Sequence, residues 1–191
     1  VKATTVLQYE ATECGAASLA TILRYYGRIV PLPQLRRECG INRDGSNAQR
    51  VLLAARSYGL QTKAYRCSGE ELASHGNFPC VVFWGFDHFL VLEGFDQKHA
   101  YVSDPAEGRL RLLKAEFFDQ FTGVVLEFAP GPEFKRGGHE ESPLWMLPGL
   151  LLPYRRQLLS LILVASVLLI PNLLVAGLTS SFISDFLQDE R

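Results

Sequence analysis

The chain has 191 residues, a formal net charge of -1 and 48% hydrophobic residues. This near-neutral charge gives no reason to expect a nucleic-acid partner, because nucleic-acid-binding domains carry a basic excess. The four cysteines are scattered without a C-x-x-C pair, and no signal peptide is recognisable at the N-terminus. We therefore expect reduced thiols in a cytosolic compartment, and neither a disulfide framework nor a zinc site.

The first chemically informative stretch is residues 6–20. We expect residues 1–9 to be an extended lead-in and Thr12 to cap a helix that ends at Gly27. Cys14 would then lie in the first turn of this helix, where unpaired N–H groups and the positive end of the helix dipole lower a thiol pKa. The helical spacing rests on Leu19, Ile22, Leu23 and Tyr26. The pattern predicts a nucleophilic thiolate at Cys14, and the alternative is a buried structural cysteine.

A glutamine on the lead-in strengthens this interpretation. Gln8 could fold its side-chain amide back beside the backbone N–H of Cys14, and two such donors would form an oxyanion hole for acyl transfer. The same Glu-Cys-Gly sequence occurs again at residues 38–40. There, Cys39 falls at the end of a short helix that begins near Pro31, where the negative dipole end would raise the thiol pKa.

The rest of the first 129 residues predicts an α+β fold. Helices are expected at 31–40, from Ser46 to Gly59 and after Ser68, with a strand at 61–66 between the last two. Short apolar, β-branched and aromatic runs then follow at hairpin-like intervals, at 80–84, 89–95, 101–103, 110–113 and 123–128, with a helical insert at 115–121. A helical lobe followed by an antiparallel sheet is typical of α+β domains.

Among the four histidines, His88 is the candidate general base. It opens the apolar strand 89–95 directly after a loop, whereas the others are expected to be solvated surface residues: His75, His99 and His139. The alternative for His88 is a half-buried packing residue.

An aspartate is expected beside His88. A tight turn near residues 96–99 would fold strand 89–95 onto strand 101–103 and place His88 opposite residues 105–107. Asp104 would then lie within three residues of His88 across the sheet, where it could orient the imidazole. Asp87 and Asp96 are rivals, and Asp104 could also be a plain turn residue before Pro105. A helix-start nucleophile followed by histidine and aspartate on neighbouring strands is the arrangement of papain-like thiol hydrolases.

The C-terminal part has a different character. Residues 130–143 have the composition of a linker, and residues 144–156 are apolar and Pro-interrupted, as expected for a segment at a membrane surface. No charged residue occurs from Gln157 to Ser184, so we expect residues 157–184 to be a transmembrane helix and 185–191 a tail. Arg155 and Arg156 precede the span and acidic residues follow it, which predicts a cytosolic N-terminal domain.

The chain resembles the bacteriocin-processing cysteine peptidases found at the N-terminus of peptidase-containing ABC transporters. It is most similar to the subgroup that serves natural-product precursors with nitrile-hydratase-type leaders. The stretches that carry the resemblance are Leu7-Gln8, Glu13-Cys14-Gly15, Tyr25-Tyr26-Gly27, Arg43-Asp44-Gly45-Ser46, 84–95, Asp104-Pro105-Ala106, 121–126 and the linker. It implies a papain-like fold with Cys14 as nucleophile, His88 as base, Asp104 as orienting residue and Gln8 in the oxyanion hole.

The resemblance also implies a substrate and partners. The expected reaction is cleavage of a precursor peptide after a Gly-Gly-type pair at the end of its leader. Trp84 and Phe86 are candidate walls of a channel too narrow for larger residues, and the alternative for both is an aromatic residue of the core. The expected partners are the leader-bearing precursor, the remaining transporter parts and the lipid bilayer of a bacterial inner membrane. No cofactor is expected in this chain, which has no G-x-x-x-x-G-K-[ST] loop, so ATP would bind a separate or missing ATPase domain.

Two other functions stay open. One is a docking domain that binds leader peptides for export without cutting them, and the other is a different papain-like acyl transfer, such as transamidation.

Overall fold

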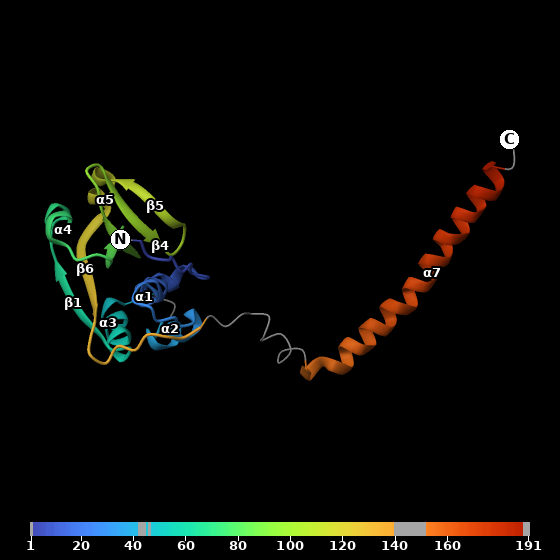
Figure 1. The fold of residues 1–191 in the computed structure, drawn as a ribbon, viewed down its shortest axis with the longest axis horizontal. Helices are drawn as coiled ribbons and strands as arrows, with labels where there is room; N and C mark the ends of the chain where they lie inside the picture. The colour runs from blue at the N-terminus through green and yellow to red at the C-terminus, as the bar shows by residue number, and fades with distance from the viewer. Residues whose placement is uncertain (1, 42–44, 46, 140–151, 189–191) are drawn as a thin grey trace. The chain divides into compact units, whose positions relative to one another are not determined.

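A computed structural model describes residues 2–41, 45, 47–139 and 152–188 (Figure 1). The chain divides into two units, residues 1–140 and 141–191, which are described separately. Part of one stretch that carries the resemblance, residues 43, 44 and 46, lies outside the described residues.

The first unit is built on one six-stranded antiparallel sheet with the strand order β1-β6-β2-β3-β4-β5. Strands β2 to β5 follow one another as hairpins, whereas β6 inserts between β1 and β2. The strands are β1 (Leu60–Arg66), β2 (Cys80–Trp84), β3 (His88–Phe95), β4 (His99–Asp104), β5 (Gly108–Leu113) and β6 (Phe121–Pro130).

Helices contribute to the cores on both faces of this sheet. The described helices of the unit are α1 (Cys14–Tyr25), α2 (Leu32–Glu38), α3 (Ala48–Ser57), α4 (Gly69–His75) and α5 (Lys114–Gln120), with a 3-10 turn, η1 (Ala11–Glu13), before α1. One core joins α1, α2 and α3 to alternate residues of β2 and β3, and the other joins α4 and α5 to the residues between them. Because both faces are buried, β2 and residues 89–92 of β3 are continuously apolar instead of alternating with polar residues. The α+β prediction is confirmed.

The start of α1 differs from expectation in one detail. The helix begins at Cys14, as required, but Thr12 lies inside the turn η1 and Glu13 occupies the N-cap position. The Glu13 carboxylate accepts hydrogen bonds from the backbone N–H groups of Tyr9 and Glu10, at 2.9 and 3.1 Å. The side chain of Glu13 therefore bonds the N–H groups that precede the turn η1. The prediction of Thr12 as the cap was wrong, because Glu13 occupies that position.

Part of the stretch with linker composition belongs to the first unit and lies against its helices and strands. The N–H of Gly131 bonds the carbonyl of Gly59 at 3.0 Å, and Gly137 exchanges hydrogen bonds with Gly27 and Ile29 at 3.0 and 2.8 Å. Phe134 packs against the core beside Tyr26. Residues 131–138 therefore form a strap on the first unit, while residues 140–143 and most of the segment 144–156 lie outside the described residues.

The second unit contains a short 3-10 turn, η2 (Leu152–Tyr154), and the helix α7 (Arg155–Gln188), with Pro171 inside it. One helix in the described chain, Leu152–Ser181, is long and apolar enough to cross a membrane. The helical part of the predicted tail reaches Gln188, and residues 189–191 lie outside the described residues.

Candidate active site

Cys14 and His88 meet because the first helix lies along the third strand. Helix α1 packs against β3, and the hydroxyl of Ser18 donates to the carbonyl of Phe89 at 3.2 Å one turn after Cys14. Cys14 is the first residue of α1 and His88 the first residue of β3. The thiol, which is 3% exposed, forms a side-chain hydrogen bond with the imidazole.

The environment of Cys14 favours its thiolate. Burial opposes ionisation, but hydrogen bonds from His88 and from the backbone N–H groups of Phe89 and Gly15, together with the charge of His88, hold the pKa of Cys14 below its ordinary value. The donors stabilise the charged form and outweigh the lost hydration.

Asp104 completes a chain of three groups. The Nε2 atom of His88 lies 2.8 Å from Oδ1 of Asp104, so Nδ1 is the ring nitrogen left for Cys14. The pKa of His88 is raised to about 10. The hydrogen bond to Asp104 is the largest cause, and the hydrogen bond to Cys14 is the next. Burial raises the pKa of Asp104, but its bonds to His88 and to the N–H groups of Ala106 and Glu107 hold it below the usual range. The arrangement can therefore maintain a thiolate–imidazolium pair.

The register of the β3–β4 hairpin explains why Asp104 is the partner. Val91 pairs with Ser103, so Asp104 comes directly after the part of β4 that pairs with β3, and its side chain reaches His88 at 2.8 Å. Of the two rivals, Asp87 is exposed, and Asp96 bonds His99 and Tyr101 at the far end of the hairpin.

Gln8 lies beside the same hairpin. Its backbone N–H donates to the carbonyl of Pro105 at 2.9 Å, which ties the lead-in to the residue after Asp104. Its side-chain Oε1 is buried without a hydrogen-bond partner among the described residues. A half-turn of the terminal amide exchanges Oε1 and Nε2, so this buried position can equally hold a donor.

Two ionic contacts that hold the lead-in are absent from our sequence prediction. Glu13 binds Arg36 of α2, with Oε1 3.0 Å from Nη1, and buried Glu93 of β3 accepts from the N–H of Ala3 at 2.9 Å while its Oε2 lies 2.6 Å from Arg109. A glutamate inside the apolar strand 89–95 was a usable signal for Glu93, because buried carboxylates are paired. No local pattern indicates Arg36.

The candidate channel residues have different surroundings. Trp84 lies directly opposite His88 in the sheet, but its ring packs against the core formed with α4 and α5. Phe86 is 81% exposed on the β2–β3 loop and has a φ of 64°, a left-handed conformation that bulky residues rarely adopt.

The other three cysteines have no comparable partner among the residues that the structure describes. Burial, followed by the charge of Glu38, raises the pKa of Cys39 to about 12. Burial also raises the pKa of Cys67 and Cys80. No group of three or more His, Cys, Asp or Glu side chains in the described part of the chain is placed to hold a metal ion.

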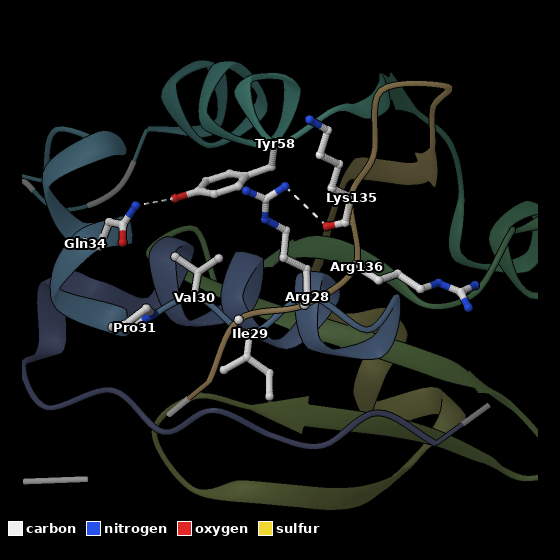
Figure 2. A pocket seen from close by; sticks show the side chains of 10 residues that line it. Arg28, Ile29, Val30, Pro31, Gln34, Tyr58, Lys135 and Arg136 are labelled. Carbon is white, nitrogen blue, oxygen red and sulfur yellow. Dashed lines mark hydrogen bonds between the residues drawn. The ribbon is translucent and has the colours of Figure 1, made fainter. Parts of the chain in front are cut away.

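A hollow on the first unit is formed by the α1–α2 connection and the strap (Figure 2). Arg28 lies 4.6 Å from the centre of the Tyr58 ring and donates to the carbonyl of Lys135 at 3.3 Å, while Gln34 donates to the Tyr58 hydroxyl at 3.1 Å. None of the described residues that line it belongs to the Cys14 site; they are Arg28, Ile29, Val30, Pro31, Gln34, Tyr58, Lys135, Arg136, Gly137 and Gly138.

The chain matches known proteins over this first unit. The model of the Peptidase C39 family matches residues 2–133. Two curated relatives from Escherichia coli are the "Probable microcin-H47 secretion/processing ATP-binding protein MchF", 36% identical over 66% of this chain, and the "Colicin V secretion/processing ATP-binding protein CvaB", 34% identical over 67% of it. The chain spans 18% of the length of each.

A solved structure shows the same similarity. The crystal structure of a double glycine motif protease from an AMS/PCAT transporter, in complex with the leader peptide, has a TM-score of 0.67 and 53% identity, covering 68% of this chain and 92% of that one. The family match includes the elements that carry Cys14, His88 and Asp104. The chain belongs to the Peptidase C39 family of cysteine peptidases.

Proposed function

We propose that this chain is a cysteine endopeptidase that cleaves leader peptides, after a double-glycine-type motif, from bacteriocin or natural-product precursors. The observation that carries the proposal is the continuous hydrogen-bonded chain from Cys14 through His88 to Asp104. The similar double glycine motif protease, crystallised with a leader peptide, supports the substrate class.

The groups of the site fit the steps of acyl transfer. The Cys14 thiolate attacks the carbonyl carbon of the scissile bond, and its negative charge moves to the carbonyl oxygen. The side-chain amide of Gln8 and the backbone N–H of Cys14 donate to that oxyanion. The imidazolium of His88 then protonates the departing amine, which leaves a thioester on Cys14.

The second half of the reaction uses the same residues in reverse. Neutral His88 takes a proton from a water molecule, whose oxygen attacks the thioester, and the leader leaves with a free carboxylate as the Cys14 thiolate is regenerated. Asp104 fixes the tautomer and orientation of the imidazole and stabilises its charged form.

Specificity for small residues would come from exclusion. Phe86, held with its ring exposed on the loop that leads into His88, is suited to narrow the path of the substrate beside the nucleophile. Trp84 would act through the position of His88, because its ring packs into the core. We expect a leader with Val in place of its final Gly to bind and not to be cleaved.

The whole protein would couple this cleavage to export. We propose that the helix Leu152–Ser181 anchors the chain in a bacterial inner membrane with the peptidase unit in the cytosol, since Arg155 and Arg156 precede it. ATP would bind transporter parts outside this chain. Protease accessibility of residues 1–139 from the outside of intact cells would contradict this topology.

The test is cleavage of defined leaders by the full chain in detergent. Peptides that carry a leader ending in Gly-Gly are incubated with wild-type chain and with Cys14→Ala, and products are read by mass spectrometry. We expect one cut, after the glycine pair, by the wild type alone. Binding by both forms without a product would instead identify a docking domain, and cross-linked products would identify transamidation.

A further inference from the structure

The carboxylate of Glu13 connects the lead-in to the nucleophile. Its side chain is 3% exposed, and it directly precedes Cys14. Oxygen Oε2 accepts from the backbone N–H groups of Tyr9 and Glu10 at 2.9 and 3.1 Å. Both residues follow Gln8 directly, so one buried side chain sets the path of the backbone between Gln8 and Cys14.

Arg36 neutralises this carboxylate from a different helix. Its Nη1 lies 3.0 Å from Oε1 of Glu13, and the same guanidinium bonds both carboxylate oxygens of Glu10 at 3.1 and 2.8 Å. An unpaired buried carboxylate beside a thiolate would be costly, because desolvation and like charge both disfavour it. The pairing with Arg36 allows a glutamate at this position.

The backbone is consequently held at Gln8 and at the two residues that follow it. The N–H of Gln8 is bonded to Pro105, and the next two N–H groups are bonded to Glu13. An oxyanion donor contributes only when it is fixed within roughly 0.5 Å of its productive position, since looser placement loses transition-state stabilisation. The backbone contacts around Gln8 are of the kind that supplies such placement.

We propose that Glu13 is a positioning residue that fixes Gln8 for oxyanion stabilisation and is itself held by Arg36. The inference rests on the proposed function, because it assigns Glu13 a part in the same reaction. The chain offers a matched control in its second Glu-Cys-Gly sequence: Glu38 precedes Cys39, is exposed, and bonds Gln34 of its own helix.

The first experiment compares Glu13→Ala with Glu38→Ala in the full chain. We expect Glu13→Ala to lower kcat for leader cleavage by about 10- to 100-fold, with KM within about twofold. The upper end of this range equals the effect expected from removing one oxyanion donor. Labelling of Cys14 by iodoacetamide should stay within about twofold of wild type, because this displacement forms no oxyanion. Glu38→Ala should change none of the three quantities.

A double variant tests whether Glu13 acts through Gln8. If it does, Gln8→Ala with Glu13→Ala is no slower than Gln8→Ala alone, because there is no donor left to position. Multiplied effects would overturn the proposal. So would equal losses of cleavage and iodoacetamide labelling, which would place the action of Glu13 on the thiolate.

Amide hydrogen exchange tests the placement without any substrate. In the wild type the N–H groups of Tyr9 and Glu10 should be protected, and Glu13→Ala should expose them while α1 stays protected. Glu13→Gln keeps an acceptor oxygen, so it should retain this protection and recover much of the turnover. If Glu13→Ala does not fold, Glu13→Gln decides between the outcomes: fully exposed Tyr9 and Glu10 amides would overturn the proposal.

The two proposals fail in different ways. A wild-type chain that cleaves no leader contradicts the proposed function, and the exchange experiment then decides the positioning role by itself. A wild-type chain that cleaves, beside a folded Glu13→Ala that cleaves equally fast, contradicts the positioning role alone.

Discussion

The two Glu-Cys-Gly sequences have identical residues and opposite chemistry. Cys14 begins α1 and bonds His88, and its pKa lies below the ordinary value. Cys39 follows the last residue of α2, and its pKa is raised to about 12. Cys14 and Cys39 are almost fully buried, at 3% and 1% exposure, so burial alone would raise the pKa of both thiols.

The difference shows what activates a thiol in this fold. Charges at helix ends are worth roughly 0.3–1 kcal/mol each, which cannot alone offset the desolvation of a buried thiolate. Cys14 gains hydrogen bonds from His88 and Phe89 on β3, whereas the neighbouring charge that acts on Cys39 is Glu38, which opposes ionisation. A partner from a distant part of the sequence therefore decides which cysteine has a lowered pKa.

Removing each thiol in turn is the strongest test of this comparison. We expect Cys14→Ala to lower cleavage by at least about 10⁴-fold, while Cys39→Ala stays within about threefold of wild type. Leader cleavage by the two purified full chains measures the difference, and circular dichroism verifies that both are folded. Equal losses in two folded variants would contradict the assignment of Cys14.

The two upstream glutamines form the next pair. Gln8→Ala should lower kcat about 100-fold or more, the ~3–4 kcal/mol expected for one oxyanion donor, with leader affinity nearly unchanged. Gln34, which precedes Cys39 and bonds Glu38 and Tyr58, serves as the control, and Gln34→Ala should leave kcat unchanged. A change confined to leader affinity would show that Gln8 contacts the substrate instead.

The pH dependence sharpens the comparison of the thiols. Cys14 should be labelled by iodoacetamide faster than Cys39 at neutral pH, because its pKa is held below the ordinary value of a thiol and that of Cys39 is raised. In His88→Ala, Cys14 stays buried but loses the hydrogen bond and the charge of His88 that lower its pKa. The pKa of Cys14 should therefore rise, and labelling at pH 7 should slow about tenfold or more.

Peptide mapping after labelling measures both cysteines at once. Cys39 should stay unlabelled at pH 7 in both forms, since its pKa is raised to about 12. Cleavage by the wild type should decline as the pH passes about 10, where His88 loses the proton that the leaving amine needs. Unchanged Cys14 labelling in His88→Ala would contradict the thiolate–imidazolium pair.

The smallest expected effect is on stability. Cys39→Ser places a hydroxyl at a buried site, which should lower the free energy of unfolding by about 1–3 kcal/mol. Cys14→Ser should cost less, because the hydroxyl can bond His88 and the N–H of Phe89. Urea unfolding of the two variants measures the difference, and a larger cost at Cys14 would reverse the structural role assigned to each cysteine.

Much of the sheet follows from local sequence. The strand predicted at residues 80–84 is β2 itself, and the strand predicted at 89–95 differs from β3 only at His88. Apolar and β-branched runs between turn residues are sufficient here, because both faces of these strands are buried. Counting residues across the β3–β4 turn was also sufficient to place Asp104 near His88, since hairpin pairing follows from loop length.

The sequence by itself determined the long apolar helix and the placement of Cys14 at a helix start, and it placed Asp104 near His88 with Asp87 and Asp96 as rivals, because each depends on periodicity or on short hairpin spacing. The tertiary structure decided that Glu13 is held by Arg36, that residues 131–138 pack onto the helices and strands of the first unit, and that hydrogen bonds from His88 and Phe89 offset the burial of Cys14. These features depend on hydrogen bonds and burial between residues distant in the chain, and no local pattern contains that information.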